Sequence, residues 1–344
     1  MGDLLEYSGL ATKIKAMKSK LLREDDYINL AESGSIADVI SYLKKIETYD
    51  EVFGEQTENV SIQRFEKLVR NSLYVDYDKI YRFSGEKQKK YLKAYFMKYE
   101  VDFLRKHIRR CLAVHTNIDT ESVDSTLFDK KSCLDENGIR AAQSMNELIA
   151  ALVNTSYYAP LKMVSVKSDA SLFDYETILD ILYFRTIWKT ADKVLSASDR
   201  KILRKTFGEK IDLLNLVWIY RAKKYYKLSQ IQMYSMVIPE YYRIKKQDMI
   251  WLIKCETLEE FDEGLKKLSY LRHDLEPENI NPETIYEERM EKLYLNTVKK
   301  EPYSIACIDS YFYMKECEIK NLIRLGECIL YQESTDTIMK CIKI

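Results

Sequence analysis

The chain has 344 residues, enough for two or three domains or one domain with a large core. It contains 9 glycines and 5 prolines, about 4% of the residues, whereas a typical protein has about 12%. Sandwiches, barrels, propellers and doubly wound α/β folds need these residues at their turns, so the composition excludes them and predicts an all-α fold. The 54 basic and 54 acidic side chains cancel, which excludes a dedicated nucleic-acid-binding protein.

The first residues, 1–6, lack the basic start and apolar run of a signal peptide. The most apolar stretch, Ile211 to Tyr220, contains Asp212 and Asn215 and is too short to cross a bilayer. The 7 cysteines form no CxxC pair, as expected for reduced thiols. We therefore expect a soluble, intracellular protein.

An acidic run follows at residues 25–29, Asp-Asp-Tyr-Ile-Asn. It has some likeness to the metal-binding run of all-helical prenyl-diphosphate enzymes. No second acidic metal motif occurs later in the chain, and acidic residues are also common at the start of a helix. The run is therefore interpreted as a helix start.

Three short helices are predicted along the chain, each by a capping box or its Asp variant. In each, a hydroxyl residue is followed by an acid, by two apolar residues four positions apart, and by a tyrosine. The copies are Ser35, Asp38, Val39, Leu43 and Tyr49; Ser144, Glu147, Leu148, Leu152 and Tyr157; and Thr257, Glu260, Phe261, Leu265 and Tyr270. Because the apolar pair lies on one helical face, that face is expected to pack in the core.

A longer amphipathic helix carrying an acid is predicted after each capped helix. An aromatic residue precedes the acid by five positions, and apolar residues follow it at the next and the fourth position. The copies are Tyr95, Glu100, Val101 and Leu104; Phe207, Asp212, Leu213 and Leu216; and Tyr313, Glu318, Ile319 and Leu322. Both patterns recur in the same order after about 110 residues. This period predicts three tandem helical modules, at 1–120, 121–237 and 238–344.

The repeated acids Glu100, Asp212 and Glu318 are candidate partner-facing residues. If they face a partner, reversing all three charges weakens partner binding and leaves the helical content unchanged. The alternative is that each acid holds a neighbouring helix of its own module, in which case the triple variant loses stability without a selective loss of binding.

No catalytic, cofactor-binding or metal-binding residues are predicted. The histidines, at 107, 115 and 273, share no helical face with another ligand at a spacing typical of zinc sites. Walker-type GxxxxGK[ST], GxGxxG and GxSxG motifs are absent. The runs 87–98 and 221–227 interleave lysines with aromatic residues, a pattern that serves nucleic-acid binding or an anionic lipid surface, but that also describes the solvated face of a helix.

Residues 7–17, followed by Leu21 and Leu22, and the segment Glu318–Glu327 (EIKNLIRLGE) resemble the opening and closing segments of the C subunit of prokaryotic V/A-type ATPases, relatives of the vacuolar ATPase d subunit. The resemblance covers essentially the whole chain. Two positions differ, because Glu327 replaces the lysine usual after the glycine and Lys13 stands where arginine is frequent.

This resemblance implies a funnel of three similar helical modules around a pseudo-threefold axis, on the cytoplasmic side of the membrane. It implies a non-catalytic subunit that binds no nucleotide, and the balanced charge already excludes nucleic acid as a partner. Its implied partners are the central-shaft subunits and the proteolipid ring, so that shaft and ring turn together during ATP-driven proton or sodium transport. A free-standing helical scaffold and an all-helical enzyme remain the alternatives; a scaffold of short tandem repeats is disfavoured because no 34- or 40-residue period occurs.

Overall fold

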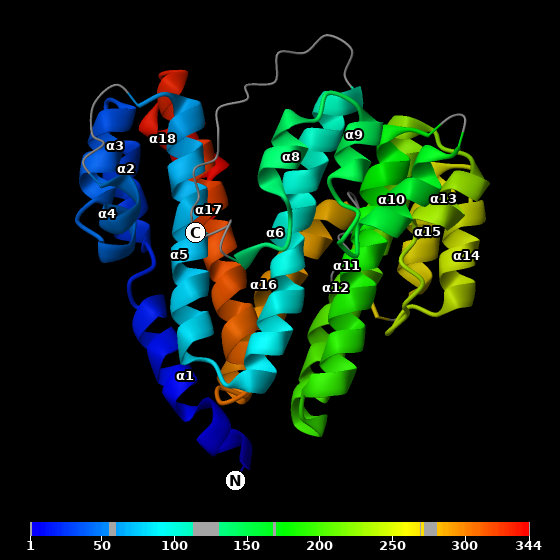
Figure 1. The fold of residues 1–344 in the computed structure, drawn as a ribbon, viewed down its shortest axis with the longest axis horizontal. Helices are drawn as coiled ribbons and strands as arrows, with labels where there is room; N and C mark the ends of the chain where they lie inside the picture. The colour runs from blue at the N-terminus through cyan, green and yellow to red at the C-terminus, as the bar shows by residue number, and fades with distance from the viewer. Residues whose placement is uncertain are drawn as a thin grey trace. The chain divides into compact units, whose positions relative to one another are not determined.

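The computed structural model describes residues 2–54, 60–112, 131–167, 170–268, 270–271 and 281–343. Throughout these ranges the regular structure is helical and no strand occurs, which confirms the predicted all-α class (Figure 1). The chain forms two compact units. Unit 1 comprises Met1–Lys89, Glu121–Lys131 and Val298–Ile344, and unit 2 comprises Lys90–Thr120 and Ser132–Thr297.

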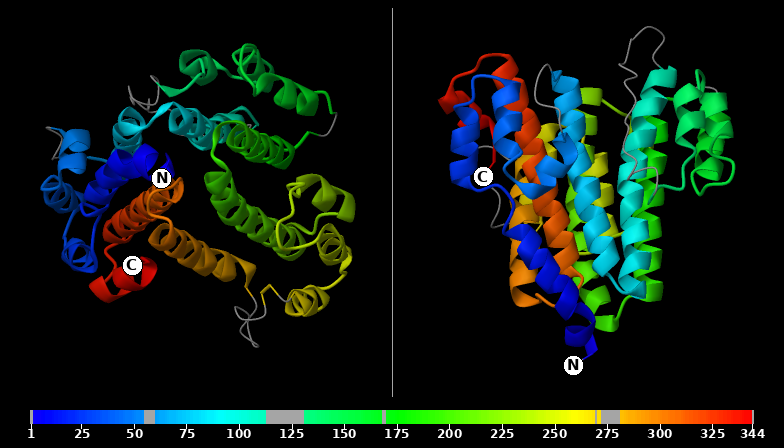
Figure 2. Two further views of the ribbon diagram at one scale, coloured as in Figure 1. Left: turned by 90° about the horizontal axis from the view of Figure 1, so that it is seen from below. Right: turned by 60° about the vertical axis from the view of Figure 1, so that its left-hand side comes forward.

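Unit 1 is built on three helices that contact one another: α1, α5 and α17 (Figure 2). Shorter helices pack on them, with α2, α3 and α18 against α17 and α4 against α5. Their bounds are α1 (Gly2–Lys18), α2 (Glu24–Ala31), α3 (Ile36–Leu43), α4 (Glu47–Phe53), α5 (Ile62–Phe83), α17 (Ala306–Leu330) and α18 (Thr335–Cys341). Unit 1 therefore joins segments from the two ends of the chain.

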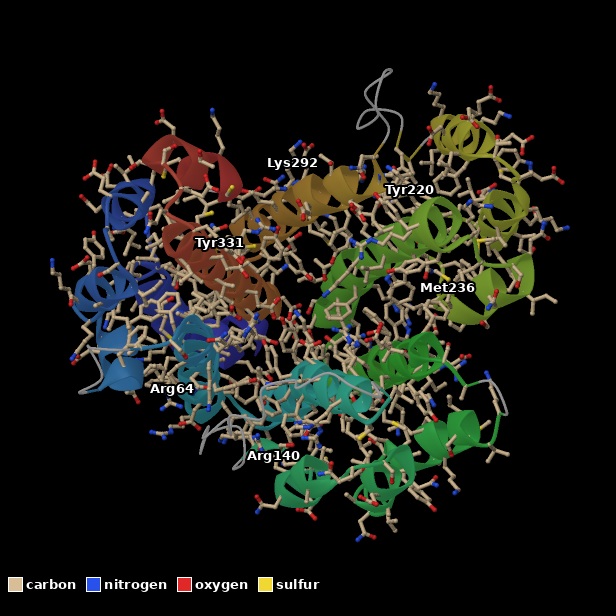
Figure 3. The ribbon with its side chains drawn as sticks, turned by 90° about the horizontal axis from the view of Figure 1, so that it is seen from above. Arg64, Arg140, Tyr220, Met236, Lys292 and Tyr331 are labelled. Carbon is tan, nitrogen blue, oxygen red and sulfur yellow. The ribbon has the colours of Figure 1, made fainter. Side chains whose placement is uncertain are left out.

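Unit 2 contains most of α6 (Glu86–Leu112) and α16 (Pro282–Lys300), whose remaining residues belong to unit 1. Its other helices are α8 (Glu136–Ala141), α9 (Met145–Ala150), α10 (Tyr158–Ser165), α11 (Leu172–Val194), α12 (Ala197–Arg221), the π-helix η1 (Ala222–Tyr226), α13 (Gln230–Met236), α14 (Lys246–Lys254) and α15 (Leu258–Lys267). Tyr220 of α12 packs on Phe261 of α15 with ring centroids 6.2 Å apart, and Met236 of α13 is also buried in this unit (Figure 3).

All three predicted caps are confirmed. The side chains of Ser35, Ser144 and Thr257 each accept a hydrogen bond from the amide three residues on, at 3.1–3.3 Å. The acids reach back toward the caps without forming the reciprocal bond of a capping box. Asp38 accepts from the hydroxyl of Ser35 at 2.7 Å, and Glu147 and Glu260 accept from the amide just before the cap. The apolar pair of each copy is fully buried, as its spacing predicts.

The acidic run at residues 25–29 begins a helix, as predicted. Asp26 lies in the first turn of α2, where its carboxylate accepts from the amide of Arg23 at 2.7 Å and from the hydroxyl of Tyr42 at 2.7 Å. Both carboxylate oxygens of Asp26 therefore serve local structure.

The two units are larger than the three predicted modules. The predicted boundary at residue 120 lies outside the described residues, whereas the boundary at 237 falls where α13 ends and a non-helical stretch begins. The three-module division therefore stays a prediction. In the described ranges, no helix has both the length and the apolar character needed to cross a bilayer.

Candidate functional site

Metal binding is the first kind of site to consider in the described part of the chain. No group of three or more His, Cys, Asp or Glu side chains there is placed to hold a metal ion. His107 is buried on α6 with its ring centroid 4.5 Å from that of Phe103, while His115 and His273 lie outside the described residues. The repeated acids are therefore the candidate site.

Burial, together with the nearby charges of Arg110, Arg140 and Lys106, lowers the pKa of His107 from 6.5 to about 3. The imidazole is thus neutral in the folded chain but takes up a proton on unfolding below pH 6.5. We expect the free energy of unfolding to fall between pH 6.5 and 4, by at most about 1.4 kcal/mol per pH unit from this group. Urea unfolding at several pH values should show a flatter profile for His107→Gln; equal slopes would contradict this account.

Glu100 on α6 is 4% exposed and holds the segment that leads into the second capped helix. One carboxylate oxygen accepts from the amide of Cys133 at 2.9 Å and the hydroxyl of Ser132 at 2.8 Å. The other accepts from the hydroxyl of Tyr157 at 2.6 Å. Burial and the adjacent carboxylate raise the pKa of Tyr157 well above its usual value, so its hydroxyl remains a donor.

Asp212 on α12 is fully buried, and its hydrogen-bond donors among the described residues are backbone amides. Its carboxylate accepts from the amides of Tyr242, Arg243 and Ile244 at 3.1, 2.6 and 3.1 Å. Burial raises the pKa of Asp212, and the three amide hydrogen bonds oppose that rise. The side chain thereby fixes the turn ahead of α14.

The capping tyrosine of the third copy has a different acidic partner. Tyr270 donates to Glu209, one turn before Asp212 on α12, at 3.3 Å. Arg289 of α16 pairs with the same carboxylate at 3.5 Å. In this copy Asp212 accepts from the backbone amides and Glu209 accepts from the tyrosine, whereas in each of the other copies one glutamate accepts from both.

Glu318 on α17 closes a buried polar network in unit 1. It accepts from the amide of Leu22 at 2.6 Å, from the hydroxyl of Tyr49 at 2.7 Å and from the ammonium of Lys315 at 2.6 Å. Lys315, with 2% of its side chain exposed, also lies 3.8 Å from Asp76 of α5. Residues separated by up to 296 positions in the chain therefore meet at one carboxylate.

A second carboxylate belongs to this network. Asp76 accepts from the hydroxyl of Tyr311 at 2.6 Å, and burial raises the pKa of Asp76 although Lys315 opposes the rise. The repeat pattern did not predict Lys315 and Asp76 as site residues. The position of Lys315 is occupied by Met97 in the first long helix and by Glu209 in the second, so a search for repeated residues passes over it.

The three acids share one arrangement. Each lies on a long helix and accepts backbone amides from the segment that leads into a group of short helices, and each is buried. The segment that an acid holds belongs to a different copy from the acid itself: Glu100 binds the second copy, Asp212 the third, and Glu318 the first. The expectation that each acid holds a helix of its own module is corrected in this respect. Contact of these acids with a partner stays a prediction.

Comparisons with known proteins find the same family over nearly the whole chain. Residues 10–341 match the family described as ATP synthase (C/AC39) subunit. The chain is 25% identical over 329 residues to the C subunit of the A-type ATP synthase of Methanosarcina acetivorans, covering 92% of this chain and 87% of that protein. It is 24% identical over 336 residues to the same subunit of Methanocaldococcus jannaschii, covering 93% and 82%. It is 23% identical over 329 residues to that of Thermococcus kodakarensis, covering 92% and 84%.

Proposed function

Because this chain belongs to the ATP synthase (C/AC39) subunit family, we propose that it is a non-catalytic rotor subunit of a V/A-type ATPase. In this role it receives the end of the central shaft and rests on the proteolipid ring at the cytoplasmic face of the membrane. Shaft and ring then turn as one body, which links ATP hydrolysis or synthesis to proton or sodium transport. Three similar helical modules, at 1–120, 121–237 and 238–344, form the funnel that takes the shaft.

One observation carries the proposal: the same buried anchor is built three times, once between the two ends of the chain. A subunit that transmits torque must resist shear between its helices. Buried carboxylates that hold backbone amides provide such resistance, because breaking one anchor leaves a charge and its donors unpaired in the interior. Glu318, by binding Leu22 and Tyr49, keeps the start of the chain attached to its last long helix.

The proposal is tested by producing the tagged chain together with the other subunits of its own complex. We expect shaft and proteolipid subunits to co-purify with it. When the chain is omitted, we expect the catalytic head to hydrolyse ATP without driving ion transport. Recovery of the chain with unrelated proteins would favour a free-standing helical scaffold, and transport that persists without the chain would contradict the proposed role.

A further inference from the structure

The three long helices expose side chains at the same positions relative to their acids. Counted from the acid, these positions are two before it, and two, six and nine after it. They form a line on each helix, which we call the accessible stripe: Lys98, Asp102, Lys106 and Arg109 on α6; Lys210, Leu214, Trp218 and Arg221 on α12; Glu316, Lys320, Arg324 and Glu327 on α17. On α12 the stripe is clearly delimited, because every residue from 206 to 220 outside it is buried.

Helical geometry places the accessible stripe opposite the acid. With about 100° per residue, the four positions lie within about 60° of the direction opposite the acid's side chain. The acid faces the segment that it anchors, so the stripe points away from that segment. The surface left open by the anchor is thus the same on each helix.

On α6 and α12 the accessible stripe is basic, although the chain as a whole has no net charge. Five of its eight positions there carry lysine or arginine and one carries an acid, whereas the stripe on α17 has two of each sign. Leu214 and Trp218, both partly exposed, supply an apolar centre on α12. Such a combination suits a partner with carboxylates around an apolar side chain.

The two arginines of this basic surface have the same local setting. Arg109 pairs with Glu176 of α11 at 2.6 Å, and Arg221 pairs with Glu283 of α16. Both arginine side chains are more than half exposed, at 56% and 52%. Exposed ion pairs contribute about 0–1 kcal/mol to stability, so stability alone does not require an arginine at this position in both helices.

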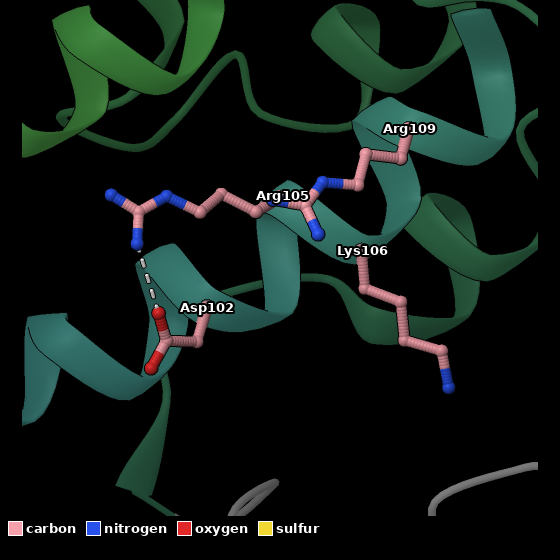
Figure 4. Close-up of a pocket in the computed structure, with 4 residues that line it drawn as sticks. All are labelled: Asp102, Arg105, Lys106 and Arg109. Carbon is pink, nitrogen blue, oxygen red and sulfur yellow. Dashed lines mark hydrogen bonds and ion pairs between the residues drawn. The ribbon is translucent and has the colours of Figure 1, made fainter. Parts of the chain in front are cut away.

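The α6 part of the stripe borders a pocket of ≈ 390 Å³ lined by Asp102, Arg105, Lys106 and Arg109 (Figure 4). Arg105 is held by Asp102, at 3.1 Å, and by Asp180. Lys106 extends away from Asp102 and Arg105 in Figure 4, and no ion pair to it is formed within the described part of the chain. The pocket therefore offers one exposed ammonium to an incoming carboxylate.

We propose that the accessible stripe of α6 and α12 binds an acidic end of the central shaft. A carboxylate of the shaft pairs with Lys106 and an apolar side chain packs on Trp218, while Arg109 and Arg221 flank the contact. This inference rests on the proposed function, which names the shaft as partner, and adds the surface and the chemistry that receive it.

The test measures binding of the purified shaft subunits to the full chain and to two variants, Lys106→Glu and Trp218→Ala. We expect each variant to weaken binding by about tenfold or more. Binding by the unaltered chain should weaken as salt rises, and this dependence should be smaller for Lys106→Glu. The matched control is Lys93→Glu, an exposed lysine of the same helix on another face, which should bind like the unaltered chain.

The outcomes separate the two proposals. If the unaltered chain binds the shaft and both stripe variants bind equally well, this inference is wrong while the proposed function stands. If Lys93→Glu weakens binding as much as Lys106→Glu, a general charge effect replaces the specific contact and the inference is again wrong. If the unaltered chain binds no shaft subunit, both proposals fail. Circular dichroism of each variant excludes loss of folding as the cause.

Discussion

Replacing Lys315 with Met is expected to destabilise unit 1 by about 3–5 kcal/mol, because Glu318 and Asp76 would then face each other without their shared cation. The ammonium is 2.6 Å from Glu318 and 3.8 Å from Asp76, and all three side chains are buried. Methionine fits the position by size, since Met97 occupies the corresponding place three residues before Glu100. The loss would therefore report charge rather than volume. Urea unfolding, followed by circular dichroism, measures it.

A second substitution provides the control. Adding Asp76→Asn to Lys315→Met removes the second carboxylate, so we expect the double variant to regain a large part of the lost stability. The remaining site then resembles that of Glu100, where a lone carboxylate is bound by a tyrosine hydroxyl and an amide. A single variant within 1 kcal/mol of the unaltered chain, or a double variant less stable than the single one, would show that the network has a different energetic basis.

Replacing Asp212 with Ala is expected to cost about 2–4 kcal/mol, because it leaves three amides without acceptors. The amides are those of residues 242–244, and the carboxylate that accepts from them is fully buried. Thermal and urea unfolding measure the loss. The control is Asp192→Ala, which removes a carboxylate from an exposed ion pair with Arg204 and should change stability by less than about 1 kcal/mol.

The same variant separates the two roles considered for the repeated acids. If Asp212 serves only as an anchor, Asp212→Ala lowers stability and any folded fraction binds the shaft with unchanged affinity. If the acid also faces the shaft, the amount of shaft bound falls by more than the decrease in folded protein explains. Measuring both quantities on one preparation distinguishes these outcomes, and an unfolding midpoint equal to that of the unaltered chain would contradict the anchoring role.

Features confined to a few neighbouring residues were predictable. A cap depends on a hydroxyl and an amide three residues apart, so Ser35, Ser144 and Thr257 could be assigned before any contact was known. The burial of Leu104, Leu216 and Leu322 follows from helical spacing relative to the acids in the same way. The comparisons with known proteins confirm the family that the opening and closing segments indicated.

The pairing between copies was not predictable from the repeat. Three similar tyrosines and three similar acids can be matched in more than one way, and every match satisfies the same local pattern. In the structure, Tyr49 meets Glu318, 269 residues away, rather than Glu100, 51 residues away. Lys315 and Asp76 are not repeated in the other copies, so the repeat does not identify them. Their ion pair forms only because α5 lies against α17.

The sequence by itself therefore determined the helical class, the caps, the core faces and the threefold recurrence, because each depends on interactions within one or two helical turns. Only the tertiary structure decided that the repeated acids are interior anchors and that the opposite face of each long helix is the one left open. The physical reason is that an acid at the edge of a helix's apolar face can point either into the protein interior or toward solvent. Which side it takes depends on whether distant backbone amides are brought within hydrogen-bonding distance.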